Sequence, residues 1–156
     1  NSGGALLDSK GRLIGINVAI ASAGSSSSSE SAAGSIGVGF SIPANLVKRV
    51  ANEIKDNGSA THGLLGATVG DATEDASATQ VGALIKSVSN GGAAAKAGLQ
   101  KGDVVTKIGS ASVSDATDLT AQVRFFAGGA STTISFIRDG QTRQADVKLG
   151  TFDSKG

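Results

Sequence analysis

Ser2 is the first side chain of this chain that could do chemistry. It stands between Asn1 and the pair Gly3-Gly4 in the opening stretch "NSGGALL". A hydroxyl framed by glycines can belong to a linker, to an ordinary turn, or to the nucleophile of a hydrolase. A serine nucleophile needs a base that takes its proton and a third group that orients the base. The elements that follow Ser2 must therefore distinguish these interpretations.

His62 is the only histidine, and it follows Ser2 by some sixty residues. It falls in "DNGSATHG", a run of turn residues in which we expect a linker and an exposed histidine without a catalytic role. A single histidine argues against a zinc site, and the absence of cysteine excludes disulfides and thiolate ligands. The sequence predicts no metal and no cofactor.

The composition is that of a globular chain with one or two small domains, since 39% of its 156 residues are hydrophobic and 17% are charged. The net charge of +1 carries no electrostatic signature of nucleic acid or of an anionic membrane. No apolar run approaches the roughly 18 residues of a membrane span, and no signal peptide opens the chain. We expect no nucleic-acid partner and any targeting segment outside this chain.

The residues that follow Ser2 predict a β-hairpin. Short apolar runs flank the turn "DSKG", a third strand follows, and apolar residues at helical spacing then lead to Gly58. The low-complexity tract 22–35 between the second and third strands is expected to be a mobile loop. The predicted elements are strands at 3–7, 12–21 and 36–43 and a helix at 44–58. They would enclose only a thin core.

A hairpin after Ser2 disfavours the G-x-S-x-G elbow of α/β-hydrolases, because that motif needs a helix directly after the serine. The ordinary-turn interpretation of "NSGG" would stand if the motif were alone. However, the segments Asn1–Leu6, Leu13–Asn17 and Gly39–Pro43 together resemble, in order and spacing, the C-terminal barrel of the HtrA/Deg family of trypsin-like serine proteases. That family has G-N-S-G-G-P-L at the nucleophile, a strand similar to "LIGIN", and "GFAIP" before a closing helix. Ala5 departs from the usual proline.

The resemblance implies a role for each matched residue of the first half. Ser2 would be the nucleophile, and its backbone N–H would be one oxyanion donor. The strand from Asn17 to Ile20 would pair with an extended substrate and, together with Phe40, wall a small or medium apolar pocket. The expected substrate-binding residues are Asn17, Val18, Ala19, Ile20 and Phe40. Because the histidine and aspartate of such proteases precede the serine, we expect this chain to be the C-terminal part of a longer protease and to be inactive alone.

The second half is α+β by pattern. It combines an Ala-rich helix that ends at Gly98, an apolar-faced helix after Ser114 or Asp115 as N-cap, and a hairpin around Asp139-Gly140. Leu119, Thr120 and Val123 share a face of the second helix, and Leu119 is expected in the core. Further strands are predicted at 82–88 and 104–108.

Gly63 to Leu149 resembles a circularly permuted bacterial PDZ domain, most specifically over Ala94 to Val105. The resemblance implies that Leu64-Leu65-Gly66-Ala67 presents backbone N–H groups to a peptide's terminal carboxylate. The peptide would add a strand to Ala67, Thr68 and Val69 and face Thr120 and Val123. The alternative is that these apolar residues are simply core. The expected peptide-binding residues are Leu64, Leu65, Gly66, Ala67, Thr68, Val69, Thr120 and Val123.

The fold class predicted is mainly β with α+β, namely the C-terminal portion of a trypsin-like double β-barrel followed by the PDZ domain. The predicted division is 1–58 protease, 59–62 linker, 63–150 PDZ domain and 151–156 tail. The family resemblance implies an extracytoplasmic endopeptidase of protein quality control that acts on unfolded or misfolded polypeptides. It also implies a homotrimer, the missing N-terminal protease half as a partner, and any membrane anchor outside this chain. The poly-Ser tract and the composition rich in Ala, Gly and Ser favour an actinobacterial, specifically mycobacterial, member of the family. The alternative is a non-catalytic module that binds peptide C-termini.

Overall fold

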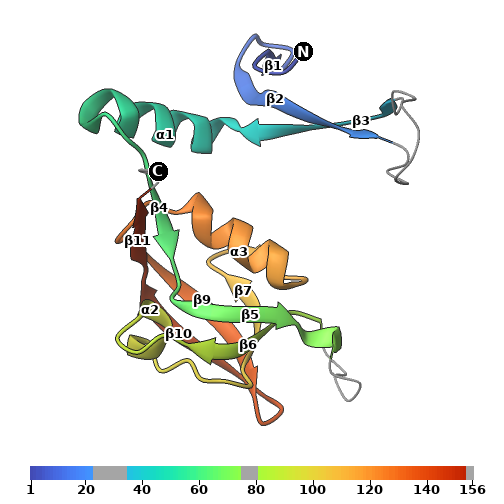
Figure 1. Cartoon of the computed structure of the whole chain (residues 1–156). Coiled ribbons are helices and arrows are strands. Elements are labelled where there is room, and N and C mark those ends of the chain that lie inside the picture. The colour runs from blue at the N-terminus through green and yellow to red at the C-terminus, as the bar shows by residue number, and fades with distance from the viewer. Residues whose placement is uncertain (23–34, 75–80, 154–156) are drawn as a thin grey trace, which may run out of the picture. The chain divides into compact units, whose positions relative to one another are not determined.

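A computed structural model describes residues 1–22, 35–74 and 81–153 of the chain, which divides into two compact units. The first unit is Asn1–Gly58 and the second is Ser59–Gly156 (Figure 1). The expected mobile loop spans 22–35, and of it the structure describes only the end residues Ser22 and Ser35. The last three residues of the expected tail, 154–156, also lie outside the described residues.

The first unit is a three-stranded antiparallel sheet followed by one helix. Its strands are β1 (Ala5–Leu7), β2 (Leu13–Ser22) and β3 (Ser35–Pro43), in the order β1-β2-β3, and α1 spans Ala44–Asn57. The predicted hairpin after Ser2 is therefore present as β1 and β2. The helix α1 ends at Gly58, which has φ +74° and donates its N–H to the carbonyl of Ile54. Glycine suits this left-handed position because it has no Cβ.

The turn between β1 and β2 is built on Asp8. Its carboxylate accepts the backbone N–H groups of Lys10 and Arg12, each at 2.9 Å, and the Arg12 guanidinium at 2.7 Å. The hydrogen bonds from Arg12 lower the pKa of Asp8. This network of hydrogen bonds fixes the hairpin. It therefore also fixes where the residues that lead into β1 lie.

The first unit buries very little apolar surface. Gly15 is the one buried residue among those whose burial the structure describes in this unit, and α1 buries none. Leu7, Ile14 and Phe40 are 53%, 49% and 60% exposed. Exposed apolar surface of this kind is typical of a region that packs against further protein.

The second unit is built on a six-stranded antiparallel sheet. Five strands follow the order β10-β9-β7-β6-β5, and β8 pairs with β7. β5 is therefore at an edge of the sheet. The strands are β5 (Ala67–Asp71), β6 (Ala83–Val88), β7 (Val104–Ile108), β8 (Ala111–Ser112), β9 (Ser131–Arg138) and β10 (Gln141–Lys148).

Three helices belong to this unit, among the residues that the structure describes. They are the 3-10 turn η1 (Ala72–Glu74), α2 (Ala93–Lys96) and α3 (Ala116–Phe125). Asp115 caps α3, because its carboxylate accepts the N–H of Asp118 at 2.7 Å. The β9–β10 hairpin turns at Asp139 and Gly140, with φ of +53° and +74°, as the Asp-Gly pair predicts.

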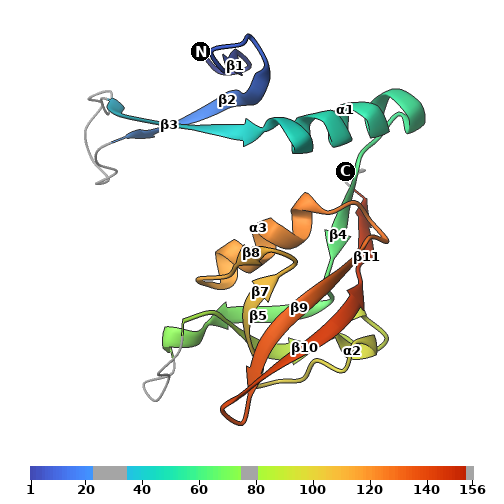
Figure 2. The same cartoon turned by 180° about the vertical axis from the view of Figure 1, so that it is seen from behind.

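A second, two-stranded sheet joins the beginning and the end of the second unit. β4 (Thr61–Leu64) pairs antiparallel with β11 (Gly150–Asp153), and both views show the two strands side by side (Figures 1 and 2). Residues 61–62 of the expected linker and residues 151–153 of the expected tail lie in these two strands. Four-residue strands with mixed polarity carry no period by which the sequence could reveal them.

His62 lies in β4 and is half-buried, rather than exposed in a linker as expected. Its Nδ1 is 3.0 Å from the carbonyl oxygen of Arg124, so this nitrogen carries the proton and donates it. The histidine therefore ties β4 to the end of α3.

The hydrophobic core of the second unit lies between the large sheet and α3. Its most deeply buried large side chains include Ile85, Leu99, Ile108, Leu119 and Ile134. The expectation that Leu119 is a core residue is confirmed, since it is 1% exposed. The core cluster runs from Leu65 to Leu149 and contains no residue of the first unit.

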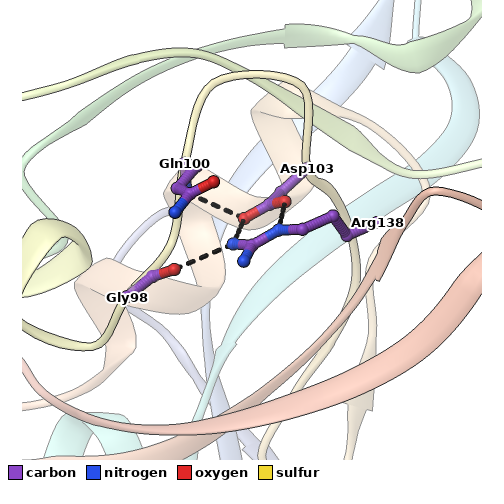
Figure 3. A network of polar contacts seen from close by, with 4 residues as sticks. All are labelled: Gly98, Gln100, Asp103 and Arg138. Carbon is purple, nitrogen blue, oxygen red and sulfur yellow. Dashed lines mark hydrogen bonds and ion pairs between the residues drawn. The ribbon is translucent and has the colours of Figure 1, made fainter.

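An ion pair between a buried aspartate and a partly buried arginine fastens the segment after α2 to β9 (Figure 3). Asp103 is 1% exposed and meets the Arg138 guanidinium through two hydrogen bonds of 2.6 and 2.7 Å. Arg138 also donates to the carbonyl of Gly98 at 2.8 Å, and Asp103 accepts the N–H of Gln100 at 2.8 Å. The hydrogen bonds with Asp103 raise the pKa of Arg138. A buried carboxylate needs such a partner, because burying an unpaired charge is very costly.

We predict that the two units differ sharply in hydrogen exchange. Amides in the core strands β6, β7 and β9 should exchange slowly and those before Gly58 fast, because among the described residues only the second unit has a buried apolar core. Exchange followed by mass spectrometry on the whole chain would measure this. Equal protection of β2 and β6 would show that the first unit is a complete domain.

Candidate functional site

Ser2 lies in a turn that is held against β2. Gly3 donates its N–H to the carbonyl of Asn17 at 2.8 Å, and Asn17 donates its own to Gly4 at 2.9 Å. Gly4 in turn donates to the carbonyl of Asn1 at 2.9 Å, while Gly3 takes φ +83°. The glycines therefore allow a tight turn whose position is fixed by backbone hydrogen bonds alone.

The Ser2 hydroxyl is exposed and donates to the carbonyl of Val18 at 3.1 Å. Within the described part of the chain, the backbone N–H of Ser2 has no hydrogen-bond acceptor. The first unit contains no histidine, so it offers Ser2 no imidazole base. The turn thus presents a hydroxyl and a free N–H side by side.

The residues expected to bind substrate lie on two paired strands. Val18 is 47% exposed, beside a register irregularity between Asn17 and Ala19, and Phe40 pairs with Ala19 across β2 and β3. For Ala19 and Ile20 the structure describes the backbone only. Ser2, Asn17 and Val18 are brought together by the hydrogen bonds of the turn.

The second unit carries a groove between the loop before β5 and the helix α3. A pocket of about 200 Å³ opens there. Its lining includes every residue expected to bind peptide except Thr68, which is exposed on the other face of β5. Leu119 and Arg124 also line it. The full set is Leu64, Leu65, Gly66, Ala67, Val69, Leu119, Thr120, Val123 and Arg124.

The two walls of the groove are tied to each other. The carboxylate of Asp71, at the end of β5, accepts the N–H of Ala116 at the start of α3, at 2.9 Å. β5 is the last strand of the described sheet, so its outer edge has no neighbouring strand. An extended segment could therefore pair with β5 while lying beside α3.

The loop at the end of the groove turns its carbonyls inward. Leu65 accepts the N–H of Ala94, and Gly66 accepts that of Ser89, both at 2.8 Å. Among the residues that the structure describes, nothing accepts a hydrogen bond from the N–H groups of Leu65 and Gly66. The loop can therefore present two unpaired donors to a ligand.

The charges around this loop are positive. Arg124 lines the pocket from α3, and its guanidinium lies 5.8 Å from the centroid of the Phe152 ring. A neighbouring pocket of about 360 Å³ shares Leu64 and Gly66 and is lined by Lys96 and Lys148. No carboxylate lines either pocket within the described chain. An anionic group would meet favourable charge from both sides.

A groove between an edge strand and a helix, closed by a loop of free N–H groups, is a peptide-binding architecture. The PDZ domain model matches residues 34–149. The chain belongs to the PDZ domain family. The match begins inside the first unit, whereas the structure separates the two units after Gly58, and the second unit alone contains the groove.

The chain is also similar to HtrA/Deg serine proteases along nearly its whole length. It is 43% identical over 151 residues to the serine protease PepD of Mycobacterium tuberculosis, covering 96% of this chain and 31% of the relative. It is 33% identical over 159 residues to the periplasmic pH-dependent serine endoprotease DegQ of Escherichia coli, covering 99% of this chain and 33% of the relative.

Solved structures give the same result. The HtrA-type protease AlgW with a decapeptide aligns with a TM-score of 0.58 at 33% identity, covering 97% of this chain and 46% of that one. A serine endoprotease from Yersinia pestis aligns with a TM-score of 0.54 at 27% identity, covering 97% and 48%. The chain therefore spans about a third of these curated relatives and under half of these solved chains.

These comparisons confirm the expected relationship to the HtrA/Deg proteases and the expected fold class, mainly β with α+β and with a PDZ domain. The circular permutation stays a prediction, as do the domain boundaries and the roles of the individual site residues. Sequence reasoning missed Arg124 as a groove residue. Its place four residues after Thr120 on the predicted helix was the available signal, since such residues are neighbours on one face.

The described residues contain neither a membrane-spanning helix nor a cluster of metal ligands. None of their helices has the length and apolar character needed to cross a membrane. No cluster of three or more histidine, aspartate or glutamate side chains in that part of the chain could hold a metal ion.

We predict that Gly66 and Gly91 differ in their tolerance of alanine although both have φ +70°. The left-handed backbone should make Gly91→Ala cost about 1 kcal/mol. A Cβ at Gly91 meets nothing within 4 Å, whereas one at Gly66 would lie 3.2 Å from the Cα of Gly92. Gly66→Ala should therefore lower the free energy of unfolding further, as urea denaturation would measure. Equal losses for the two variants would contradict the close packing of the loop.

Proposed function

We propose that the PDZ groove binds the free C-terminus of an extended polypeptide. The observation that carries this proposal is the pair of unpaired N–H groups at Leu65 and Gly66, at the end of the open edge of β5. The terminal carboxylate would accept both N–H groups, and the preceding residues would pair with Ala67 to Val69 as an added strand. Backbone donors that converge on one point form a natural anion site.

The final side chain of the peptide would enter the pocket of about 200 Å³. That pocket is lined mainly by apolar side chains from the loop, β5 and α3, among them Leu65, Val69 and Val123. An apolar terminal residue is therefore favoured over a polar one, because a polar side chain would lose its hydration there. The peptides named in the AlgW structures support a peptide as the ligand.

We predict micromolar affinity for a peptide that has a free carboxylate and an apolar last residue, since so short a strand buries little area. Amidation of the same peptide should weaken binding by about tenfold or more, because it removes the charge that the two N–H groups would meet. Titration by fluorescence anisotropy would compare the two forms. If both bound equally well, the loop would not be a carboxylate site and Leu64 to Ala67 would be only core.

We further propose that Ser2 is the nucleophile of a serine endopeptidase in a longer protein. Its Oγ would attack the substrate carbonyl carbon and pass its proton to a histidine from a part of that protein outside this chain. The free N–H of Ser2 would donate to the oxyanion that forms. Two observations support this role. Backbone hydrogen bonds hold the turn at Ser2 against Asn17, and the relatives are named as serine proteases.

The strand from Asn17 to Ile20 would hold the substrate backbone, with Phe40 at the wall of the side-chain pocket. The exposed apolar side chains of the first unit support its packing against further protease residues, the missing N-terminal half. We propose unfolded or misfolded polypeptides as substrates, a homotrimeric parent, and an extracytoplasmic location with any membrane anchor outside this chain. The periplasmic names of relatives such as DegQ support the location.

The second candidate is a peptide-binding module without catalysis. It is favoured because the second unit contains the whole groove, whereas the first unit, which contains Ser2, has no histidine. Both candidates share the PDZ groove, and only the first requires chemistry at Ser2.

We predict that the 156-residue chain alone does not cleave casein, because Ser2 has no base within its unit. The longer protein that contains this chain should cleave it, and Ser2→Ala should reduce that activity at least a thousandfold. Release of casein fragments would be followed on gels. Thr142→Ala, a change at an exposed residue of β10, is the control that should keep full activity. Cleavage by the isolated chain at the same rate would refute the proposed catalytic arrangement.

A further inference from the structure

We propose that Arg124 gives the groove a preference for a carboxylate side chain at the third residue from the peptide C-terminus. This inference rests on the proposed binding of peptide C-termini and adds a selectivity to it. The observation behind it is that Arg124 lines two pockets at once, the one at the loop and a second one farther along the groove.

The second pocket has a volume of about 340 Å³ and lies between β5 and α3. It shares Val69, Thr120 and Arg124 with the first pocket, so the two form one continuous groove. Ala116, Thr117 and Ala121 complete its lining. Four of the lining residues are spaced three and four positions apart, which places them along one face of α3. They are Thr117, Thr120, Ala121 and Arg124. The long Arg124 side chain can lie along this row because helical side chains lean toward the helix N-terminus.

The register of an added strand assigns a peptide residue to each pocket. With the terminal carboxylate at Leu65 and Gly66, the last side chain points into the first pocket. Side chains alternate along a strand, so the third residue from the end faces the same way, about 7 Å farther along. It therefore faces α3 at the second pocket, whereas the residue between them points away.

Within the described chain, Arg124 is the one basic residue that lines the second pocket, and no acidic residue lines it. The Thr120 hydroxyl donates its hydrogen to the carbonyl of Ala116 at 2.8 Å, so it cannot also donate to a ligand. The acid at the end of β5, Asp71, accepts the N–H of Ala116, and Asp118 accepts the N–H of Ser114. These carboxylates therefore have partners of their own at the start of α3.

Arg124 is available for a new ion pair. The structure shows no carboxylate bonded to it among the described residues, and its guanidinium instead lies over the ring of Phe152. A cation–π contact at an exposed site is weak, so an acidic peptide side chain can compete with it or share the guanidinium. An arginine can also bind a carboxylate through two parallel hydrogen bonds, which adds geometric selectivity.

The experiment compares three free-acid peptides that differ only at the third residue from the end, which is Glu, Gln or Lys. Each has the same apolar last residue and is titrated by fluorescence anisotropy against the whole chain. The variants are Arg124→Gln, which removes the charge, and Arg124→Glu, which reverses it. Arg143→Gln is the matched control, because Arg143 is an exposed arginine of the same unit that lines none of these pockets.

The parent chain should bind the Glu peptide about threefold to fivefold more tightly than the Gln peptide, the range of a partly exposed ion pair. Arg124→Gln should abolish this ratio, Arg124→Glu should transfer the preference to the Lys peptide, and Arg143→Gln should leave the ratio unchanged. The preference should also fade at high salt, because ions screen an exposed pair.

An unchanged Glu-to-Gln ratio in Arg124→Gln, or no ratio in the parent chain, would overturn the inference. Equal weakening of all three peptides in Arg124→Gln would also overturn it, since Arg124 would then pair with the terminal carboxylate. The Gln peptide and its amidated form separate this failure from failure of the proposed function. If the free acid binds more tightly than the amide while the Glu preference is missing, the groove function stands and only the role of Arg124 is wrong.

Discussion

The groove depends on two backbone hydrogen bonds that hold the 64–67 loop against the segment before and within α2. The carbonyls of Leu65 and Gly66 accept the N–H groups of Ala94 and Ser89, whereas the N–H groups of the same two residues have no partner among the residues that the structure describes. The arrangement requires glycine at position 66, where φ is +70° and a Cβ would lie 3.2 Å from the Cα of Gly92. An unpaired N–H is costly where water cannot reach it, so such donors lie where water or a ligand can bind them.

Other contacts keep this loop and its surroundings in place. The Asp103–Arg138 pair, with its bonds to Gly98 and Gln100, anchors the segment that follows α2 to β9 (Figure 3). The bond from Ala116 to Asp71 sets the opposite wall, α3, at the end of β5. The residues of the Asp103–Arg138 network lie outside the two pockets along α3, whereas Ala116 also lines the second pocket, so its hydrogen bond to Asp71 fixes α3 at the groove itself.

Sequence reasoning located the elements and most of the groove, because glycine positions, capping residues and apolar periods are local signals. The stretch before Gly58 was predicted as a hairpin, a strand and a helix, and β1, β2, β3 and α1 follow that order. Three long-range contacts were not predicted. They are the β4–β11 pairing, the hydrogen bond between His62 and Arg124, and the Asp103–Arg138 ion pair. Each joins residues far apart in the chain, and nothing in either partner's local sequence marks the other. Arg124 was missed for a related reason, since an exposed arginine on a helix looks like ordinary surface until the opposite wall is known.

The most direct test of the account is a nuclear magnetic resonance titration of the ¹⁵N-labelled chain with one apolar-ended peptide in its free-acid and amidated forms. The account predicts that the free acid moves the amide proton signals of Leu65 and Gly66 downfield, as new hydrogen bonds to a carboxylate require, and slows their exchange with solvent. The amidated peptide should leave both signals close to their free positions. Large shifts confined to other amides, or identical shifts with both peptides, would contradict the claim that these two N–H groups form a carboxylate site.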